Sequence, residues 1–145
     1  MSVAILLVTH GGMGSELMKT VRDILNMPIS LPVAVLNISQ EQMLPEFICQ
    51  RIKKLSDQLN QGQGVLVLTD LIGSTPCNSV SSVCRQNEAE ENTYPLRSLA
   101  GLNLPMLLNV MSAALVFPHL NISELAQKAE EGGQQGIQNP CYAHS

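Results

Sequence analysis

A histidine and an aspartate stand at the ends of two apolar segments of the sequence. His10 follows the run Val3–Thr9 and precedes two glycines, which allow backbone amides to approach a ligand closely. Asp70 ends the run Val65–Thr69 at the equivalent level. If the two residues meet, the carboxylate accepts a hydrogen bond from the Nδ1–H of His10 and leaves Nε2 free to act as a nucleophile. The alternative is a histidine that only caps its strand, but the aspartate favours the catalytic interpretation.

Ser74 and Thr75 supply further polar donors. They precede Pro76, which suits the first residue of a helix, and a helix N-terminus offers amides and hydroxyls to a phosphate or a carboxylate. The alternative role is helix capping, which we expect Thr75 to perform. His119 and His144 have no partner motif, and we expect both at the surface. No group of His, Cys, Asp and Glu has the spacing of a metal site, and we expect no metal and no cofactor.

Apolar periodicity predicts strands and helices in alternation. Apolar runs of the kind buried in a parallel sheet predict strands over Val3–Thr9, Val33–Ile38 and Val65–Thr69, and the less apolar segment Leu96–Ala100 predicts a weaker fourth strand. Helical spacing predicts helices behind Ser15 as N-cap, behind the capping box Ser39-x-x-Gln42, from Pro76, from Pro105, and over Ser123–Glu131. Pro45 fits poorly inside the second of these and is expected to shift its start.

This alternation predicts an α/β fold, an open and mostly parallel sheet of about four strands flanked by helices. Ligands bind such sheets beyond the carboxyl ends of the strands, where the strand order reverses. Three loops fall there: His10-Gly11-Gly12, Asp70 to Pro76 and Gly101 to Pro105. Pro95 and Arg97 place the fourth strand at an edge of the sheet.

Composition excludes several classes of function. The chain has 145 residues, enough for one domain, which we expect over residues 1–137 with a polar tail at 138–145. Eight Lys+Arg against twelve Asp+Glu, with no basic block, argue against nucleic acid as a partner. No apolar run approaches the roughly 18 residues of a membrane span. We therefore expect a soluble, cytoplasmic protein without direct membrane insertion. A dinucleotide site is disfavoured because HGGMGSEL is not a G-x-G-x-x-G motif and Asn37 stands where a ribose-binding acid is expected.

Three motifs resemble one protein family over nearly the whole chain. They are Thr9-His10-Gly11-Gly12, Asp70 to Asn78 (DLIGSTPCN), and Gly101 to Leu107 (GLNLPML). Together they resemble the enzyme IIA component, mannose family, of the bacterial phosphoenolpyruvate-dependent sugar phosphotransferase system. The family usually has D-L-F-G-G-[ST]-P, whereas this chain has Ile72 for the aromatic residue and Ser74 for the second glycine.

The resemblance implies a phosphoryl carrier. The histidine-containing phosphocarrier protein would be the donor, His10 the residue phosphorylated, Asp70 its partner, and a IIB component the acceptor during sugar uptake. Amides and hydroxyls around Gly11, Gly12, Ser74 and Thr75 would hold the phosphoryl oxygens. The family is also homodimeric through an exchanged C-terminal strand, expected here near Gly136 to Gln138, with Gly132-Gly133 as hinge. No Ala/Pro-rich linker and no IIB domain follow within the 145 residues, so we expect a free-standing IIA subunit.

Two alternatives use a histidine after a first strand. A histidine phosphatase needs an arginine where this chain has Thr9, and the chain is short of other arginines to bind phosphate. A regulatory phosphoprotein would use the same His10 without sugar transport. A neighbouring set of transport components in the genome would distinguish these functions.

Overall fold

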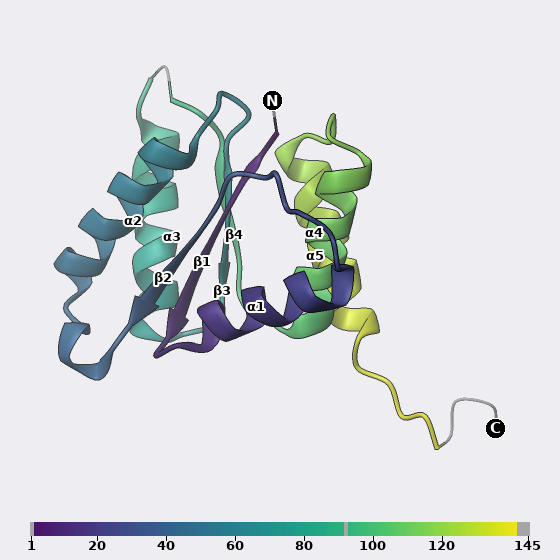
Figure 1. The fold of residues 1–145 in the computed structure, drawn as a ribbon. Helices are drawn as coiled ribbons and strands as arrows, with labels where there is room; N and C mark the ends of the chain where they lie inside the picture. The colour runs from purple at the N-terminus through teal and green to yellow at the C-terminus, as the bar shows by residue number, and fades with distance from the viewer. Residues whose placement is uncertain (1, 92, 142–145) are drawn as a thin grey trace.

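The computed structural model describes residues 2–91 and 93–141 and contains an alternation of strands and helices (Figure 1). The strands are β1 (Ala4–His10), β2 (Val33–Ile38), β3 (Val65–Thr69) and β4 (Leu96–Leu99). The helices are α1 (Met13–Leu25), α2 (Pro45–Leu59), α3 (Thr75–Ala89), α4 (Leu104–Val116) and α5 (Ile122–Gln135), with a short 3₁₀ turn η1 (Gln40–Gln42) before α2. The predicted α/β class is therefore confirmed.

The four strands form one parallel sheet in the order β2-β1-β3-β4. β4 is an edge strand, as Pro95 and Arg97 predict. From β1 the chain first moves outward to β2 and then crosses back to β3 on the other side of β1, so the order reverses between β1 and β3. In the register of these two strands Val8 lies opposite Thr69. Beyond this last pair lie Thr9 and His10 on β1 and Asp70 after β3.

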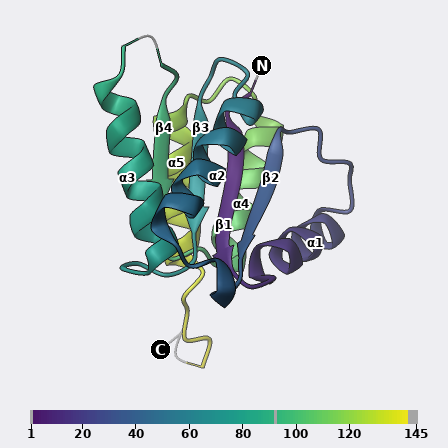
Figure 2. The ribbon, with the colours of Figure 1, turned by 90° about the vertical axis from the view of Figure 1, so that its left-hand side faces the viewer.

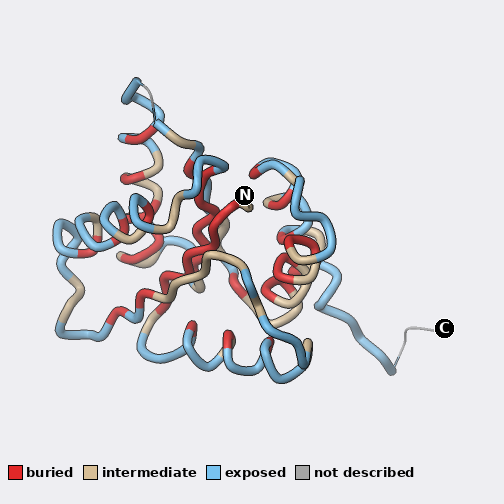
Figure 3. The backbone as a smooth tube through the Cα atoms, turned by 45° about the horizontal axis from the view of Figure 1, so that its top comes forward, coloured by how far each residue is buried: buried red, intermediate tan, exposed pale blue. Residues whose placement is uncertain are grey.

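Helices cover both faces of the sheet, with α2 and α3 on one face and α1, α4 and α5 on the other (Figures 1 and 2). Side chains of β1 and β3 alternate between two apolar cores, and both strands are buried along their length (Figure 3). Ile5 and Leu7 face α1 and α4, whereas Leu6 and Val8 face α2 and α3. A continuous apolar run is what a strand buried on both faces requires. None of the helices in the described part of the chain is long and apolar enough to cross a membrane.

Two helices begin at different residues from those expected. α1 starts at Met13 with Gly12 as N-cap, and not behind Ser15, because the buried Thr9 hydroxyl accepts a hydrogen bond from the Gly14 N–H at 2.8 Å. This bond satisfies one of the free donors of the first turn from outside the helix. The predicted capping box between Ser39 and Gln42 is present, but it opens η1.

A prolyl residue explains the start of α2. Pro45 occupies the first turn, where a missing N–H costs nothing and the fixed φ suits the helix. Pro45 is therefore not a misfit inside a longer helix but the place where α2 starts, after the break at Met43 and Leu44.

α5 extends beyond its expected end at Glu131, through Gly132 and Gly133 to Gln135. These glycines allow α5 to approach α4 closely, because a Cβ at Gly132 would lie 2.5 Å from the Cβ of Asn109. Asn109 Nδ2 in turn donates to the Lys128 carbonyl at 2.6 Å. Close packing thus retains two glycines that helix propensity alone would disfavour. His144 and the end of the tail lie outside the described residues.

We expect Gly132→Ala to destabilise the protein by about 1–3 kcal/mol, because the added methyl group overpacks the contact with Asn109. At an exposed helical position the same change would stabilise by roughly 0.5–1 kcal/mol. Chemical denaturation measures the difference, with Gln127→Ala on the exposed side of α5 as the control. A Gly132→Ala protein more stable than wild type would contradict the tight contact.

Candidate active site

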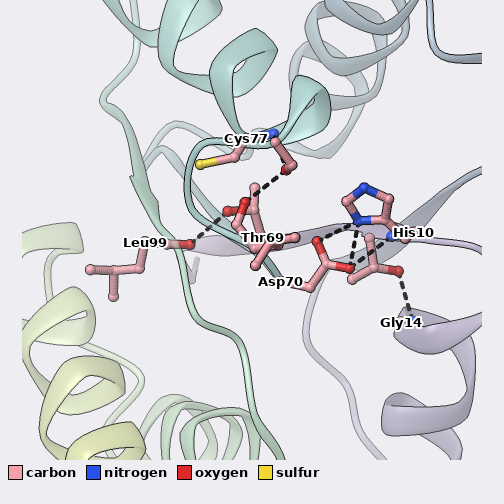
Figure 4. A network of polar contacts seen from close by, with 9 residues as sticks. His10, Gly14, Thr69, Asp70, Cys77 and Leu99 are labelled. Carbon is pink, nitrogen blue, oxygen red and sulfur yellow. Dashed lines mark hydrogen bonds and ion pairs between the residues drawn. The ribbon is translucent and has the colours of Figure 1, made fainter.

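The site is built around an ion-pair-like contact between His10 and Asp70. His10 is the last residue of β1, and Asp70 follows the last residue of β3, so neighbouring parallel strands bring them together. Nδ1 of His10 lies 2.9 Å from Oδ2 and 3.1 Å from Oδ1 of Asp70 (Figure 4). The backbone N–H of His10 also donates to Oδ2 at 2.9 Å. The predicted pairing of His10 and Asp70 is present in the structure.

The two side chains differ in their exposure. The Asp70 side chain is 8% exposed and the His10 side chain 35% exposed. An ionised carboxylate accepts hydrogen bonds but does not donate them, so Nδ1 is the protonated nitrogen of a neutral ring in this contact, and the lone pair of such a ring is on Nε2. Nε2 lies on the side of the ring that points away from Asp70 (Figure 4). The second ring nitrogen of the pair is therefore directed away from the carboxylate, on a side chain that is partly exposed.

The turn after β1 is fixed by its own backbone. Gly11 has φ +52°, a left-handed conformation that glycine adopts without strain, and its N–H donates to the Ile38 carbonyl at the end of β2. The Gly11 amide is thereby engaged within the fold. Gly12 is exposed as the N-cap of α1, and its N–H has no partner among the described residues. The Gly12 amide is thus a free donor beside His10.

The loop between Asp70 and α3 is also tightly held. Ser74, and not Thr75 as expected, is the N-cap of α3: its backbone is extended and its hydroxyl accepts from the Cys77 N–H at 3.4 Å. The same hydroxyl donates to the Leu71 carbonyl at 2.7 Å. Its single hydrogen is therefore already used. Thr75 is the first residue of α3, half-buried, and offers the N-terminal amide of that helix.

The third predicted loop, Gly101 to Pro105, lies at the same edge of the sheet, but its hydrogen bonds are made within the fold. The Leu102 N–H donates to the Thr69 carbonyl at 2.9 Å, next to Asp70. Asn103 caps α4 through the Met106 N–H and also donates to the Gly133 carbonyl of α5. The loop therefore joins the site to the α4 and α5 layer.

The sequence did not predict two polar residues that fix the elements next to the site. Thr9 is fully buried and fixes the start of α1, and Asn37 Nδ2 donates to the Ser15 hydroxyl at 2.8 Å. The signal for Thr9 is a hydroxyl at the end of an otherwise apolar buried strand, where it needs a partner. His119 is exposed, as expected. Among residues 2–91 and 93–141 no group of His, Cys, Asp and Glu is placed to hold a metal ion.

Comparisons with known proteins agree with this geometry. The family model of EIIA-man, described as the PTS system fructose IIA component, matches residues 4–130. The PTS system mannose-specific EIIAB component of Escherichia coli (strain K12) is 29% identical over 141 residues, which are 94% of this chain and 39% of that protein. The chain thus spans about two fifths of the length of the curated relatives it matches.

Solved structures show the same fold. The phosphotransferase system component EIIA from Streptococcus agalactiae has a TM-score of 0.79 at 23% identity, over 97% of this chain and 99% of that chain. The mannose/sorbose specific IIA subunit of the phosphotransferase system from Enterococcus faecalis has a TM-score of 0.75 at 27% identity, over 96% of this chain and 95% of that chain. Because the family model matches most of the sequence, the protein belongs to the EIIA-man family of IIA components of the phosphotransferase system.

Proposed function

We propose that the protein is a cytoplasmic phosphoryl carrier that is phosphorylated on Nε2 of His10. The observation that carries this proposal is the 2.9 Å contact between His10 Nδ1 and Asp70, because in a neutral ring it puts the proton on Nδ1 and the lone pair on Nε2, which points away from the carboxylate (Figure 4). The donor is the histidine-containing phosphocarrier protein and the acceptor a IIB component, so that the phosphoryl group serves sugar uptake. Membership of a phosphotransferase-system family supports this assignment.

The reaction requires mainly that the protein align the reacting groups and stabilise the charge that develops on them. The lone pair of His10 Nε2 forms a bond to phosphorus while the P–N bond of the donor breaks, and the donor ring nitrogen keeps the electron pair. The proton on Nδ1 stays between His10 and Asp70. Asp70 holds the ring in one tautomer and stabilises the positive charge that develops on it. Transfer between two imidazoles is nearly balanced in driving force, so the same groups serve the forward step to the acceptor.

Four residues around the ring are proposed to hold the phosphoryl group, in two different ways. The Gly12 amide and the N-terminal donors of α3 at Thr75 would bind its oxygens, as helix N-termini do for other anions. Gly11 and Ser74 would shape the site, because the Gly11 amide and the Ser74 hydroxyl already donate to backbone carbonyls.

We further propose that the chain, with a carrier domain over residues 1–137, forms a homodimer through its C-terminal segment. β4 is an open edge of the sheet, and such an edge invites another strand. Ile137 is 79% exposed and lines a shallow hollow beside Leu99 and Gly101 at the end of β4. Gly132 and Gly133 lie within α5 and Gly136 is its C-cap, so we place the start of the exchanged segment at Gly136 rather than at a hinge over the two glycines.

His10→Ala is expected to abolish phosphorylation because it removes the only proposed acceptor nitrogen. The protein is incubated with phosphoenolpyruvate, enzyme I and the phosphocarrier protein, and intact mass reports one acid-labile phosphoryl group on wild type and none on the variant. His119→Ala, which alters an exposed histidine, is the control and is expected to label fully. Equal labelling of His10→Ala would refute the assignment of the site.

Asp70→Ala is expected to slow phosphorylation of His10 by about 10²–10⁴-fold, because the ring loses its fixed tautomer and its neighbouring charge. Asp70→Asn keeps the shape but replaces one carboxylate oxygen by an NH2 donor, so it removes the charge and no longer holds the proton on Nδ1 of His10, and it is expected to be slow as well. Rapid-quench labelling measures the rates, circular dichroism checks the fold, and Asp23→Ala on exposed α1 is the control. A wild-type rate in both Asp70 variants would reduce this aspartate to a strand-end cap.

Removal of residues 136–145 is expected to give a monomer or an aggregate, because the proposed exchanged segment is lost while α5 is kept whole. Multi-angle light scattering compares the truncated chain with the full chain, which is expected to be a dimer. A truncated chain that remains a well-behaved dimer would show that this segment is not the exchanged element.

A further inference from the structure

The turn between β1 and α1 follows His10 directly, and side-chain packing does not hold it in place. Gly11 and Gly12 form this turn, and a Cβ added to either glycine would meet nothing within 4 Å. Two successive glycines also give the backbone more conformational freedom than other residues do. The position of the Gly12 amide beside His10 therefore depends on hydrogen bonds to the elements on either side of the turn.

Two hydrogen bonds fix this turn within the fold. On the side of β2, the Gly11 N–H donates to the Ile38 carbonyl at 2.9 Å. On the side of α1, the Gly14 N–H donates to the Thr9 hydroxyl at 2.8 Å (Figure 4). The second bond closes a loop of six residues, from Thr9 to Gly14, which contains His10 and both glycines of the turn.

The bond between Thr9 and Gly14 is shielded from water. Thr9 is fully buried, and a Cβ at the buried Gly14 would lie 2.9 Å from Thr9 Oγ1 and 2.8 Å from Val35 Cγ1. A buried amide that loses its partner is left without a hydrogen bond, which is strongly unfavourable. The nearby contact between Asn37 Nδ2 and the Ser15 hydroxyl is exposed, so water competes for both groups. The Thr9 bond is therefore the stronger constraint on the first turn of α1.

A second buried threonine occupies a comparable place on β3. Thr69 is 1% exposed and directly precedes Asp70 in the chain. Its hydroxyl donates to the Leu99 carbonyl of β4 at 3.4 Å, so it holds the neighbouring strand and not a turn of the site (Figure 4). Thr9 and Thr69 thus match in residue type and burial but differ in the element that each hydroxyl holds.

Resting on the proposed function, we propose that Thr9 is a positioning residue for phosphoryl transfer to His10. Its hydroxyl holds Gly14, and through it the first turn of α1, so that the free Gly12 N–H is directed at the oxygens of the incoming phosphoryl group. Because Thr9 is fully buried, it acts only through these backbone groups. A donor that is in place before the reaction stabilises the charge of the transition state without reorganisation.

The geometry of this contact gives the size of the expected effect. In Thr9→Val a methyl group replaces the hydroxyl, and apolar carbon atoms pack at about 3.5–4.0 Å, whereas the present contact with the Gly14 nitrogen is 2.8 Å long. The first turn of α1 is therefore displaced by roughly 1 Å, and a misplacement of this size near reacting groups lowers a rate on the order of 100-fold.

Thr9→Val is expected to lower the rate of His10 phosphorylation at saturating phosphocarrier protein about 10–100-fold, because the displaced Gly12 amide no longer meets the transition state. The donor concentration for half-saturation is expected to change less than about threefold, since a buried residue takes no part in binding the donor. Thr69→Val loses a similarly buried hydroxyl and is the matched control, with the wild-type rate expected. Rapid-quench labelling measures the rates, and chemical denaturation measures the free energy of unfolding.

A second pair of variants separates the hydroxyl from the size of the side chain. Thr9→Ser and Thr9→Ala both lose the buried γ-methyl group, and both are expected to be less stable than wild type. Only Thr9→Ser keeps the hydroxyl, so it alone is expected to keep a rate within about threefold of wild type. Equal rates in this pair, or an equal loss of rate in Thr69→Val, would overturn Thr9 as a positioning residue while leaving His10 as the phosphorylated residue. A wild-type chain that the phosphocarrier protein does not phosphorylate would overturn the proposed function itself.

Discussion

The pairing of β1 with β3 is the constraint on which the site depends. In a parallel sheet every strand ends at the same edge, and the register of these two strands leaves His10 and Asp70 as neighbours. The strand order also reverses at this point, which is where ligands bind in open α/β sheets. The meeting of the two side chains therefore follows from backbone pairing that ends at Val8 and Thr69, in strands buried on both faces.

Much of this arrangement was predictable from the sequence, because buried parallel strands are continuous apolar runs with few alternative interpretations. The position of His10 and of Asp70 after such runs was sufficient to place them together. Helix boundaries were less predictable. The start of α1 depends on the Thr9 hydroxyl, which reaches forward over five residues, and the end of α5 depends on the fit of Gly132 against Asn109. Both are contacts between elements, and propensity along the chain carries no information about them.

The helices that cover the two faces of the sheet have different structural roles. α4 and α5 pack closely through glycines and asparagine side chains, and the loop that ends with Asn103 joins them to the edge that carries the site. α2 and α3, by contrast, begin at the edge of the sheet where His10 is partly exposed. The α4 and α5 layer is thus the structural support, while the first turns of α1, α2 and α3 border the edge that carries His10 and Asp70.

Asp70 receives two hydrogen bonds from the same residue, one from the His10 ring and one from the His10 backbone. The backbone N–H and the ring nitrogen share Oδ2, so a change of charge on the ring alters the bond to the amide as well. The amide of His10 is consequently a built-in spectroscopic reporter. Its nuclear magnetic resonance frequency follows the state of the ring in solution, without any label attached to the surface that a partner would cover.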